Sequence, residues 1–199
     1  YTLVATSAAG TRSATVTVQV TQLPVAGTWS EWIARYNLPA DPAADTDGDS
    51  LPAALEFALA LDPTRGDSSV STVPGADPTI PRGVRMEQTF LPDGTRRFDL
   101  VFTRPRVARP GVGYWLEATL NLQQGWGIVA DLNGAGATDI PQFLDIAVTD
   151  LDDGTEEVRA GLRGFSQGYL RLSIDAGGGT VRSAPFGWVK RTLHRQNNL

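Results

Sequence analysis

A twelve-residue acidic segment, residues 45–56, constrains this chain more than any other part of it. Its sequence is Asp-Thr-Asp-Gly-Asp-Ser-Leu-Pro-Ala-Ala-Leu-Glu, so carboxylates stand at positions 1, 3, 5 and 12. Calcium binds about six to eight oxygen atoms, and acidic residues at this spacing can surround one point. A solvated acidic loop between two helices is the alternative, and the glutamate at position 12 disfavours it. We therefore predict a calcium site formed by the side chains of Asp45, Asp47, Asp49 and Glu56 and the backbone carbonyl of Leu51.

Two positions of the segment depart from the usual pattern of such loops. Position 6 is Ser50, where a left-handed backbone favours glycine, and the serine costs on the order of 1 kcal/mol. Position 8 is Pro52, which has no N–H and cannot make the short antiparallel pairing that couples two regulatory loops. The sequence contains no second complete loop to pair with. We therefore expect the cation to stabilise the fold and not to act as a switch.

Helices are predicted on both sides of the acidic segment. Thr28 and Glu31 form a capping box that opens a helix ending near Asn37. Pro52 suits the first turn of a second helix, which the sequence Asp62-Pro63 ends.

The first residues alternate apolar and polar side chains, which predicts a β-hairpin at residues 1–22 with strands at 1–5 and 14–20. The pattern is similar to the last two strands of an immunoglobulin-like (Ig-like) domain, which needs about seven strands. We therefore expect the chain to start inside such a domain. The open edges of the hairpin need a cover. Either the β module of the same chain or a neighbouring copy, through β-strand addition, can supply it.

The rest of the chain is predicted to be β structure, so the fold class is mainly β. Residues 66–83 are rich in Gly, Ser, Pro and Asp and are interpreted as a linker. Residues 84–199 are interpreted as an antiparallel β-sandwich module. The strands expected there are 84–90, 97–103, 114–119, 126–130, 143–149, 156–162, 169–174 and 186–193. The predicted organisation is a partial Ig-like hairpin (1–22), a helix–calcium loop–helix segment (23–65), the linker (66–83) and the sandwich (84–199).

Composition excludes several classes of function. The chain has no cysteine, which removes disulfides and thiol catalysis. It lacks a run of about 18 apolar residues, so we expect no membrane span. Its net charge is −5 and its arginines are scattered among acids, so we expect no nucleic-acid partner. The single histidine, His194, lies five residues from the end, and the clustered acids belong to the metal loop, so we expect no catalysis.

Three tryptophans in predicted strands raise a different possibility of binding. An exposed row of Trp115, Trp126 and Trp188 would stack on sugar rings of a polysaccharide. Aromatic residues more often fill a sandwich core, which is the arrangement we expect here.

A resemblance follows from the order of these parts. An Ig-like end, then Asp-Thr-Asp-Gly-Asp-Ser-Leu-Pro-Ala-Ala-Leu-Glu-Phe-Ala-Leu-Ala-Leu-Asp-Pro, then a β module containing residues 114–126, resembles the C-terminal region of large secreted bacterial proteins of the verrucomicrobial and planctomycete type. The acidic segment is also similar to dockerin loops and thrombospondin type 3 repeats, whose Asp-rich loops hold structural calcium. The resemblance implies that Asp45, Asp47, Asp49 and Glu56 are ligands and that the protein is extracellular or at the cell surface. It departs at Ser50 and lacks the duplicated loop of a cohesin-binding dockerin.

Two functional classes follow. The first is a non-catalytic extracellular structural or adhesive module, rigidified by calcium, that forms homo-oligomers such as a surface fibre or packs on neighbouring domains. The alternative is a carbohydrate-binding accessory domain of a secreted enzyme.

Overall fold

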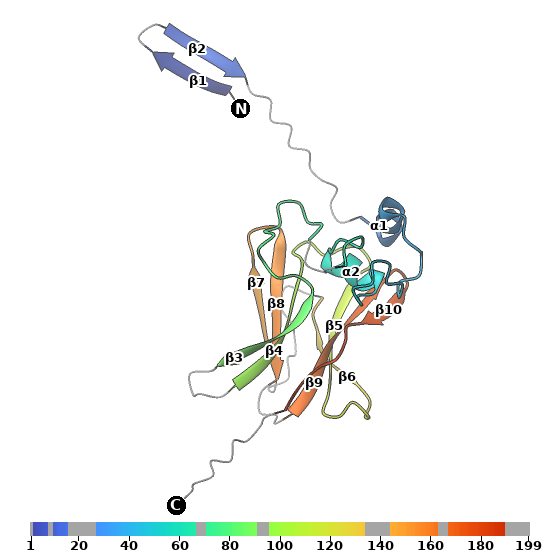
Figure 1. Cartoon of the computed structure of the whole chain (residues 1–199). Coiled ribbons are helices and arrows are strands. Elements are labelled where there is room, and N and C mark those ends of the chain that lie inside the picture. Colours follow the sequence, from blue (N-terminus) through green and yellow to red (C-terminus); the bar gives the residue numbers. More distant parts are fainter. Residues whose placement is uncertain are drawn as a thin grey trace, which may run out of the picture.

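The computed structural model describes residues 2–7, 10–15, 27–66, 71–90, 96–133, 144–162 and 167–189. Two antiparallel sheets face each other, and two short helices lie at one end of them (Figure 1). The prediction of a mainly β, sandwich-like fold with a small helical segment is confirmed. Among the described residues, neither helix is long and apolar enough to cross a membrane.

The first sheet has the order β3-β4-β8-β7, with every neighbouring pair antiparallel. Alternation along the central strands directs Leu100 and Phe102 of β4, and Val158 and Ala160 of β8, into the core. The strands are β3 (Val84–Phe90), β4 (Arg96–Pro105), β7 (Leu144–Asp150) and β8 (Thr155–Leu162).

The second sheet has the order β10-β9-β5-β6, and β11 also pairs with β9. Its strands are β5 (Gly113–Thr119), β6 (Gly127–Asp131), β9 (Gln167–Ala176), β10 (Gly179–Arg182) and β11 (Phe186–Val189). β10 pairs with residues 173–176 of β9 and β11 with residues 167–170. Between them Ser183 N–H donates to the Leu172 carbonyl at 2.9 Å, so these two short strands continue one edge of β9.

Every strand predicted in the β module is present, with bounds that differ by a few residues. The last one, predicted at 186–193, is described only to Val189. β10 was not predicted. It has four residues between the Gly177-Gly178 turn and Pro185, too few for an alternating pattern to be visible.

Both helices begin where the sequence predicts, and the first also ends there, but the second ends at Leu59, before the predicted stop at Asp62-Pro63. α1 (Trp29–Tyr36) starts at the capping box, in which Thr28 N–H donates to Glu31 Oε2 at 2.8 Å. It ends at Asn37, whose backbone is left-handed. α2 (Ala53–Leu59) follows Pro52 and ends at Ala60, which is also left-handed.

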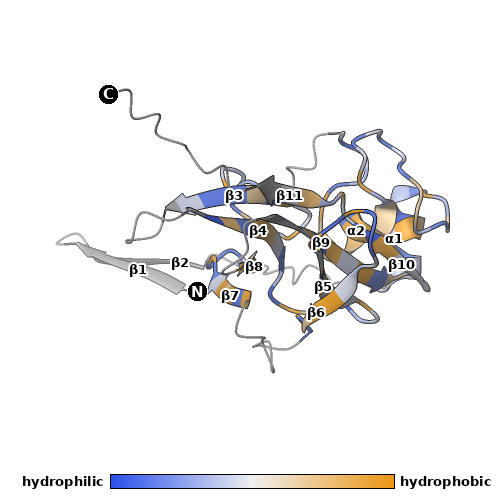
Figure 2. Ribbon diagram, turned by 90° about the horizontal axis from the view of Figure 1, so that it is seen from below, coloured by the Kyte–Doolittle hydropathy of each residue, from blue (hydrophilic) through white to orange (hydrophobic). Residues whose placement is uncertain are grey.

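α2 is fully buried, which the sequence did not indicate. Each of its seven residues is at most 2% exposed. The helix contacts β4 of one sheet and β9 and β10 of the other, and Figure 2 shows its apolar residues at that end of the sandwich. The Tyr114 hydroxyl donates to the Ala58 carbonyl and Arg109 Nη1 to the Phe57 carbonyl, each at 2.6 Å. The sandwich thus supplies partners for carbonyls that the end of a helix leaves unpaired.

One hydrophobic core therefore runs through two segments that were predicted as separate units. It includes Trp32 of α1, Phe57 of α2 and Leu172 of β9. Thr72, within the predicted linker, is tied to the end of α2, because its N–H donates to the Ala60 carbonyl at 2.6 Å. The exact domain boundaries stay a prediction.

The N-terminal hairpin consists of β1 (Thr2–Ser7) and β2 (Gly10–Thr15), with Thr2 opposite Thr15. Its second strand begins four residues before the predicted start at residue 14, and residues 16–22 lie outside the described part. Among the described strands, β1 and β2 pair only with each other (Figure 1).

Candidate metal centre

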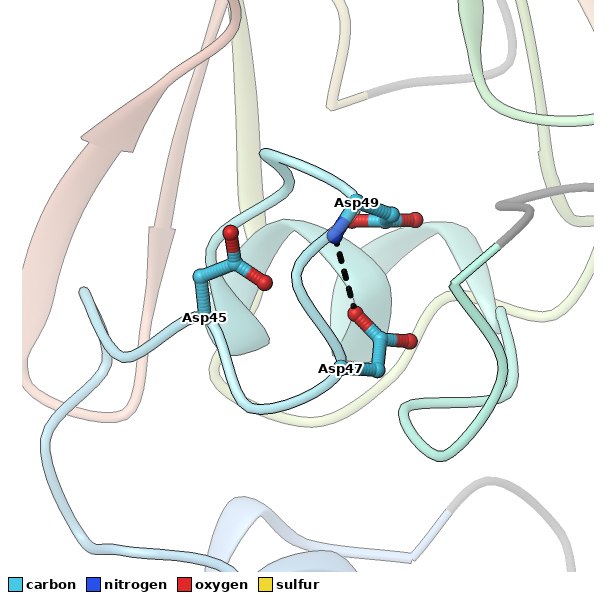
Figure 3. A group of neighbouring side chains, drawn as sticks. All are labelled: Asp45, Asp47 and Asp49. Carbon is cyan, nitrogen blue, oxygen red and sulfur yellow. Dashed lines mark hydrogen bonds between the residues drawn. The ribbon is translucent and has the colours of Figure 1, made fainter.

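The carboxylates of three aspartates of the acidic segment lie close together on one loop (Figure 3). Asp45, Asp47 and Asp49 each offer a carboxylate oxygen, and these oxygens lie within 4.8 Å of one another. The structure thus brings together three of the predicted ligands. Such a group of oxygens suits a hard divalent cation.

The backbone of the loop folds around these side chains. Asp45 accepts from Gly48 N–H at 2.8 Å and from Ser50 N–H at 3.0 Å. Leu51 N–H donates to Asp49 Oδ1 at 2.7 Å. Ser50 has φ 70°, so position 6 does adopt the left-handed backbone that glycine tolerates best.

Glu56 lies in the first turn of α2 and is completely buried. Neither of its carboxylate oxygens has a hydrogen-bond partner among the described residues, and the same holds for Oδ2 of Asp47. Burial, followed by the charges of Asp47, Asp49, Asp45 and Asp62, raises the pKa of Glu56 from 4.5 to about 8. Glu56 is not within the 4.8 Å group, but its pKa responds to all three aspartates. A buried carboxylate without a counter-charge is costly.

Hydrogen bonds connect the start of α2 to the residues before the loop, and connect Thr46 of the loop to Pro63, beyond the end of α2. Ala53 N–H donates to the Ala44 carbonyl at 2.7 Å, and Ala54 N–H donates to the Pro42 carbonyl at 3.0 Å. Thr46 Oγ1 donates to the Pro63 carbonyl at 3.2 Å. The segment before the loop therefore supplies the acceptors for the first N–H groups of α2, as a helix N-terminus requires.

Leu51 joins the loop to the helix, and its side chain packs against the hydrophobic core. Its role as a carbonyl ligand stays a prediction. The sequence pattern indicated the three aspartates whose carboxylates lie together, and their role as ligands, with that of Glu56, stays a prediction. It did not indicate how deeply Glu56 is buried, because that depends on strands distant in the sequence.

The remaining predicted residues lie elsewhere. Trp115 and Trp126 are half-buried, and neither belongs to the hydrophobic core, so the expectation that they fill it is wrong. Trp115 alternates with the core residues Tyr114 and Leu116 and so faces away from the other sheet. The side chain of Trp188 and all of His194 lie outside the described residues.

No protein-family model matches this chain, and no curated protein matches it. The interpretation of the site therefore depends on its own residues. The candidate metal ligands among them are the carboxylates of Asp45, Asp47, Asp49 and Glu56.

Proposed function

We propose that this chain is a non-catalytic extracellular structural or adhesive module whose fold is rigidified by calcium. The observation that carries the proposal is the fully buried Glu56 carboxylate, whose pKa is raised by burial and by the charges of Asp47, Asp49 and Asp45 and which has no hydrogen-bond partner among the described residues. A divalent cation between these groups would supply the missing counter-charge.

Calcium suits the donors better than magnesium. Four carboxylates and a carbonyl offer many oxygens in a loop of irregular shape, and calcium accepts such flexible coordination. Magnesium requires a small octahedral shell and keeps several waters. Extracellular modules bind calcium with dissociation constants on the order of 0.1–1 mM. An affinity in that range is compatible with a strained serine at position 6 of the loop. The resemblance of the loop to those of secreted bacterial proteins supports the same location.

The burial of α2 extends the effect of the metal to the whole sandwich. Glu56 belongs to a helix that contacts both sheets, so the loop and the sheets share one core. A cation that binds only the folded state at about 100 times its dissociation constant adds ~2.7 kcal/mol to the free energy of unfolding. We expect the sandwich, and not only residues 28–63, to receive that stabilisation.

Thermal unfolding with calcium, with magnesium and with a chelator tests the proposal. Calcium should raise the unfolding midpoint of the wild type and should do so far less in Asp47→Asn. Asp41→Asn is the matched control, since Asp41 precedes the acidic segment by four residues and its Oδ1 accepts from Ala43 N–H at 2.9 Å. Equal midpoints with calcium and with chelator in the wild type would reject the metal site.

The hairpin supports a second part of the proposal, assembly through β-strand addition. Among the described strands β1 and β2 pair only with each other, so each has an outer edge of unpaired backbone groups. Pairing with a neighbouring copy would cover these edges and produce a fibre or surface array. Deleting residues 1–22 should abolish association seen by light scattering or electron microscopy. Unaltered assembly in the deletion variant would show that this mode of association is wrong.

A further inference from the structure

We infer that the outer face of the sheet β10-β9-β5-β6 binds a neutral polysaccharide along its two central strands. The inference concerns a surface on the other side of the sheet from α2 and does not depend on the calcium proposal.

The outward residues of β5 and β9 follow from the strand register. Leu116 and Leu172 lie opposite each other and point into the core. Alternation therefore directs Trp115 and Glu117 of β5, and Arg171 and Tyr169 of β9, to the outer face. Glu117 lies opposite Arg171, and Tyr169 lies opposite Thr119. The face thus has an aromatic residue toward each end and a charged pair between them.

Two glycines allow the aromatic rings to extend along the sheet surface. A Cβ atom at Gly113 would lie 2.2 Å from the indole ring of Trp115, so that ring occupies the space above Gly113. A Cβ atom at Gly187 would lie 2.3 Å from the ring of Tyr169. Both rings are half-buried against the backbone of a glycine. They therefore line the surface of the sheet and are not inserted between the two sheets.

The charged groups between the rings neutralise one another. Glu117 is 5% exposed although it faces outward, and its Oε2 accepts from Arg171 Nε at 2.6 Å. Arg182 Nε donates to Glu117 Oε1 at 3.2 Å. The guanidinium of Arg171 in turn lies 4.0 Å above the ring of Trp126. This arrangement is a cation–π contact that holds the Arg171 guanidinium over the ring of Trp126.

A sugar chain matches this surface chemically. The C–H faces of pyranose rings pack on the electron-rich faces of aromatic rings. Their hydroxyl groups donate to carboxylates and accept from guanidinium groups, and the exposed Asp175 and Arg182 supply these here, because Glu117 is buried and already paired.

Tyr169 lies opposite Thr119, which is four residues along β5 from Trp115. The two aromatic residues are therefore about 13 Å apart along the strands, a span that favours a chain of sugars over a single sugar. On this face the acidic residues Glu117, Asp131 and Asp175 outnumber Arg171 and Arg182, so the face offers no excess positive charge to an anionic ligand.

Affinity electrophoresis of the whole chain tests the inference. The probes are soluble neutral polysaccharides, namely hydroxyethyl cellulose, glucomannan, xylan and laminarin, with alginate as the anionic comparison. At least one neutral polysaccharide should retard the wild type and quench its tryptophan fluorescence. Tyr169→Leu and Trp126→Leu, which keep an apolar side chain in place of the ring, should each weaken that binding by up to about tenfold.

Controls distinguish loss of the site from loss of the fold. Tyr36→Leu removes a half-buried aromatic from α1, away from this face, and should leave retardation unchanged. The calcium-dependent rise in the unfolding midpoint should persist in Tyr169→Leu and Trp126→Leu, so failure here and failure of the calcium proposal are separable. Absence of retardation by every neutral polysaccharide would overturn the inference. So would binding that both leucine variants retain, or self-association of the wild type that Trp126→Leu abolishes, since the face would then be an interface between copies.

Discussion

Two groups of buried carboxylates in this molecule differ in where their counter-charge comes from. On the outer face of the sheet β3-β4-β8-β7, Asp99 is 1% exposed and lies 2.7 Å from Arg97 Nε. In the acidic loop, Glu56 is 0% exposed and no arginine or lysine among the described residues pairs with it. Burial has a similar electrostatic cost in both places. The sheet carries its own cations in the sequence, and we infer that the loop takes its cation from solution.

The pKa values show the same difference. Burial alone would raise the pKa of Glu87 in the sheet, but hydrogen bonds from Arg159 and Arg85 outweigh it and hold that pKa below its ordinary value. In the loop, burial and neighbouring aspartates act in the same direction and raise the pKa of Glu56 to about 8. A carboxylate that is set in a network of arginines therefore stays ionised, whereas the one in the loop resists ionisation.

The largest expected effect comes from breaking the network in the sheet. Asp99→Ala removes one partner of a buried ion pair and leaves Arg97 without it, which should cost about 3 kcal/mol of the free energy of unfolding. Chemical denaturation with calcium and with chelator should give the same loss. A loss that depends on calcium would mean that the two groups of carboxylates are not independent.

Glu56→Gln should act in opposite directions with and without calcium. With the metal at about 100 times its wild-type dissociation constant, the variant should lose most of the ~2.7 kcal/mol that binding contributes. Without the metal at neutral pH, the variant should be more stable than the wild type. The wild type must protonate Glu56 in order to bury it at that pH, and a glutamine is neutral already. Glu87→Gln in the sheet is the matched control and should be destabilised equally in both conditions. Destabilisation of Glu56→Gln in chelator would contradict the account.

The pH dependence of stability should also differ between the calcium-free and calcium-bound protein. Glu56 has a folded-state pKa of about 8, above its ordinary value of 4.5, so the folded protein holds a proton that the unfolded chain releases. The calcium-free protein should therefore lose stability as pH rises from about 4.5 to about 8, and the loss should level off above that range. Calcium should remove this slope and bind more tightly as pH rises. Denaturation midpoints across the range measure both effects.

The smallest expected effect concerns the left-handed residue of the loop. Ser50 has φ 70°, a conformation in which a side chain is strained, so Ser50→Gly should stabilise the loop by about 1 kcal/mol and tighten calcium binding. Ala60→Gly, at another left-handed position outside the loop, should stabilise the fold without changing calcium affinity. Calorimetric titration of both variants separates the two outcomes. Weaker binding by Ser50→Gly would be contrary to this interpretation.

Local patterns were sufficient for most elements but not for their burial. Alternation predicted the strands, and the spacing of acids predicted which aspartates converge, because both depend on neighbours in the sequence. Leu55 and Leu59 lie one helical turn apart and by themselves indicate one apolar face for α2, yet the whole helix is buried. Ala53, Ala54 and Ala58 cover its other faces, and small side chains give no periodic signal while they allow close packing.

Residues that depend on strand register were not predictable in the same way. The sequence around Trp115 does not indicate that its ring lies over Gly113 on the outer face of the sheet. Pairing with distant strands decides which face of the sheet each side chain of a strand lies on. The partners of the α2 carbonyls, Arg109 and Tyr114, lie more than fifty residues beyond the helix.

Isothermal titration of the whole chain with calcium near pH 6.5, in two buffers of different ionisation enthalpy, measures metal binding and proton release together. We expect one calcium ion to bind per chain, with release of about one proton from the Glu56 carboxyl as the metal binds. Glu56→Gln should release none and bind more weakly, while Glu87→Gln should behave as the wild type does. Absence of calcium binding, or binding with equal heat in both buffers, would contradict the claim that the buried carboxylates of the loop take their counter-charge from solution.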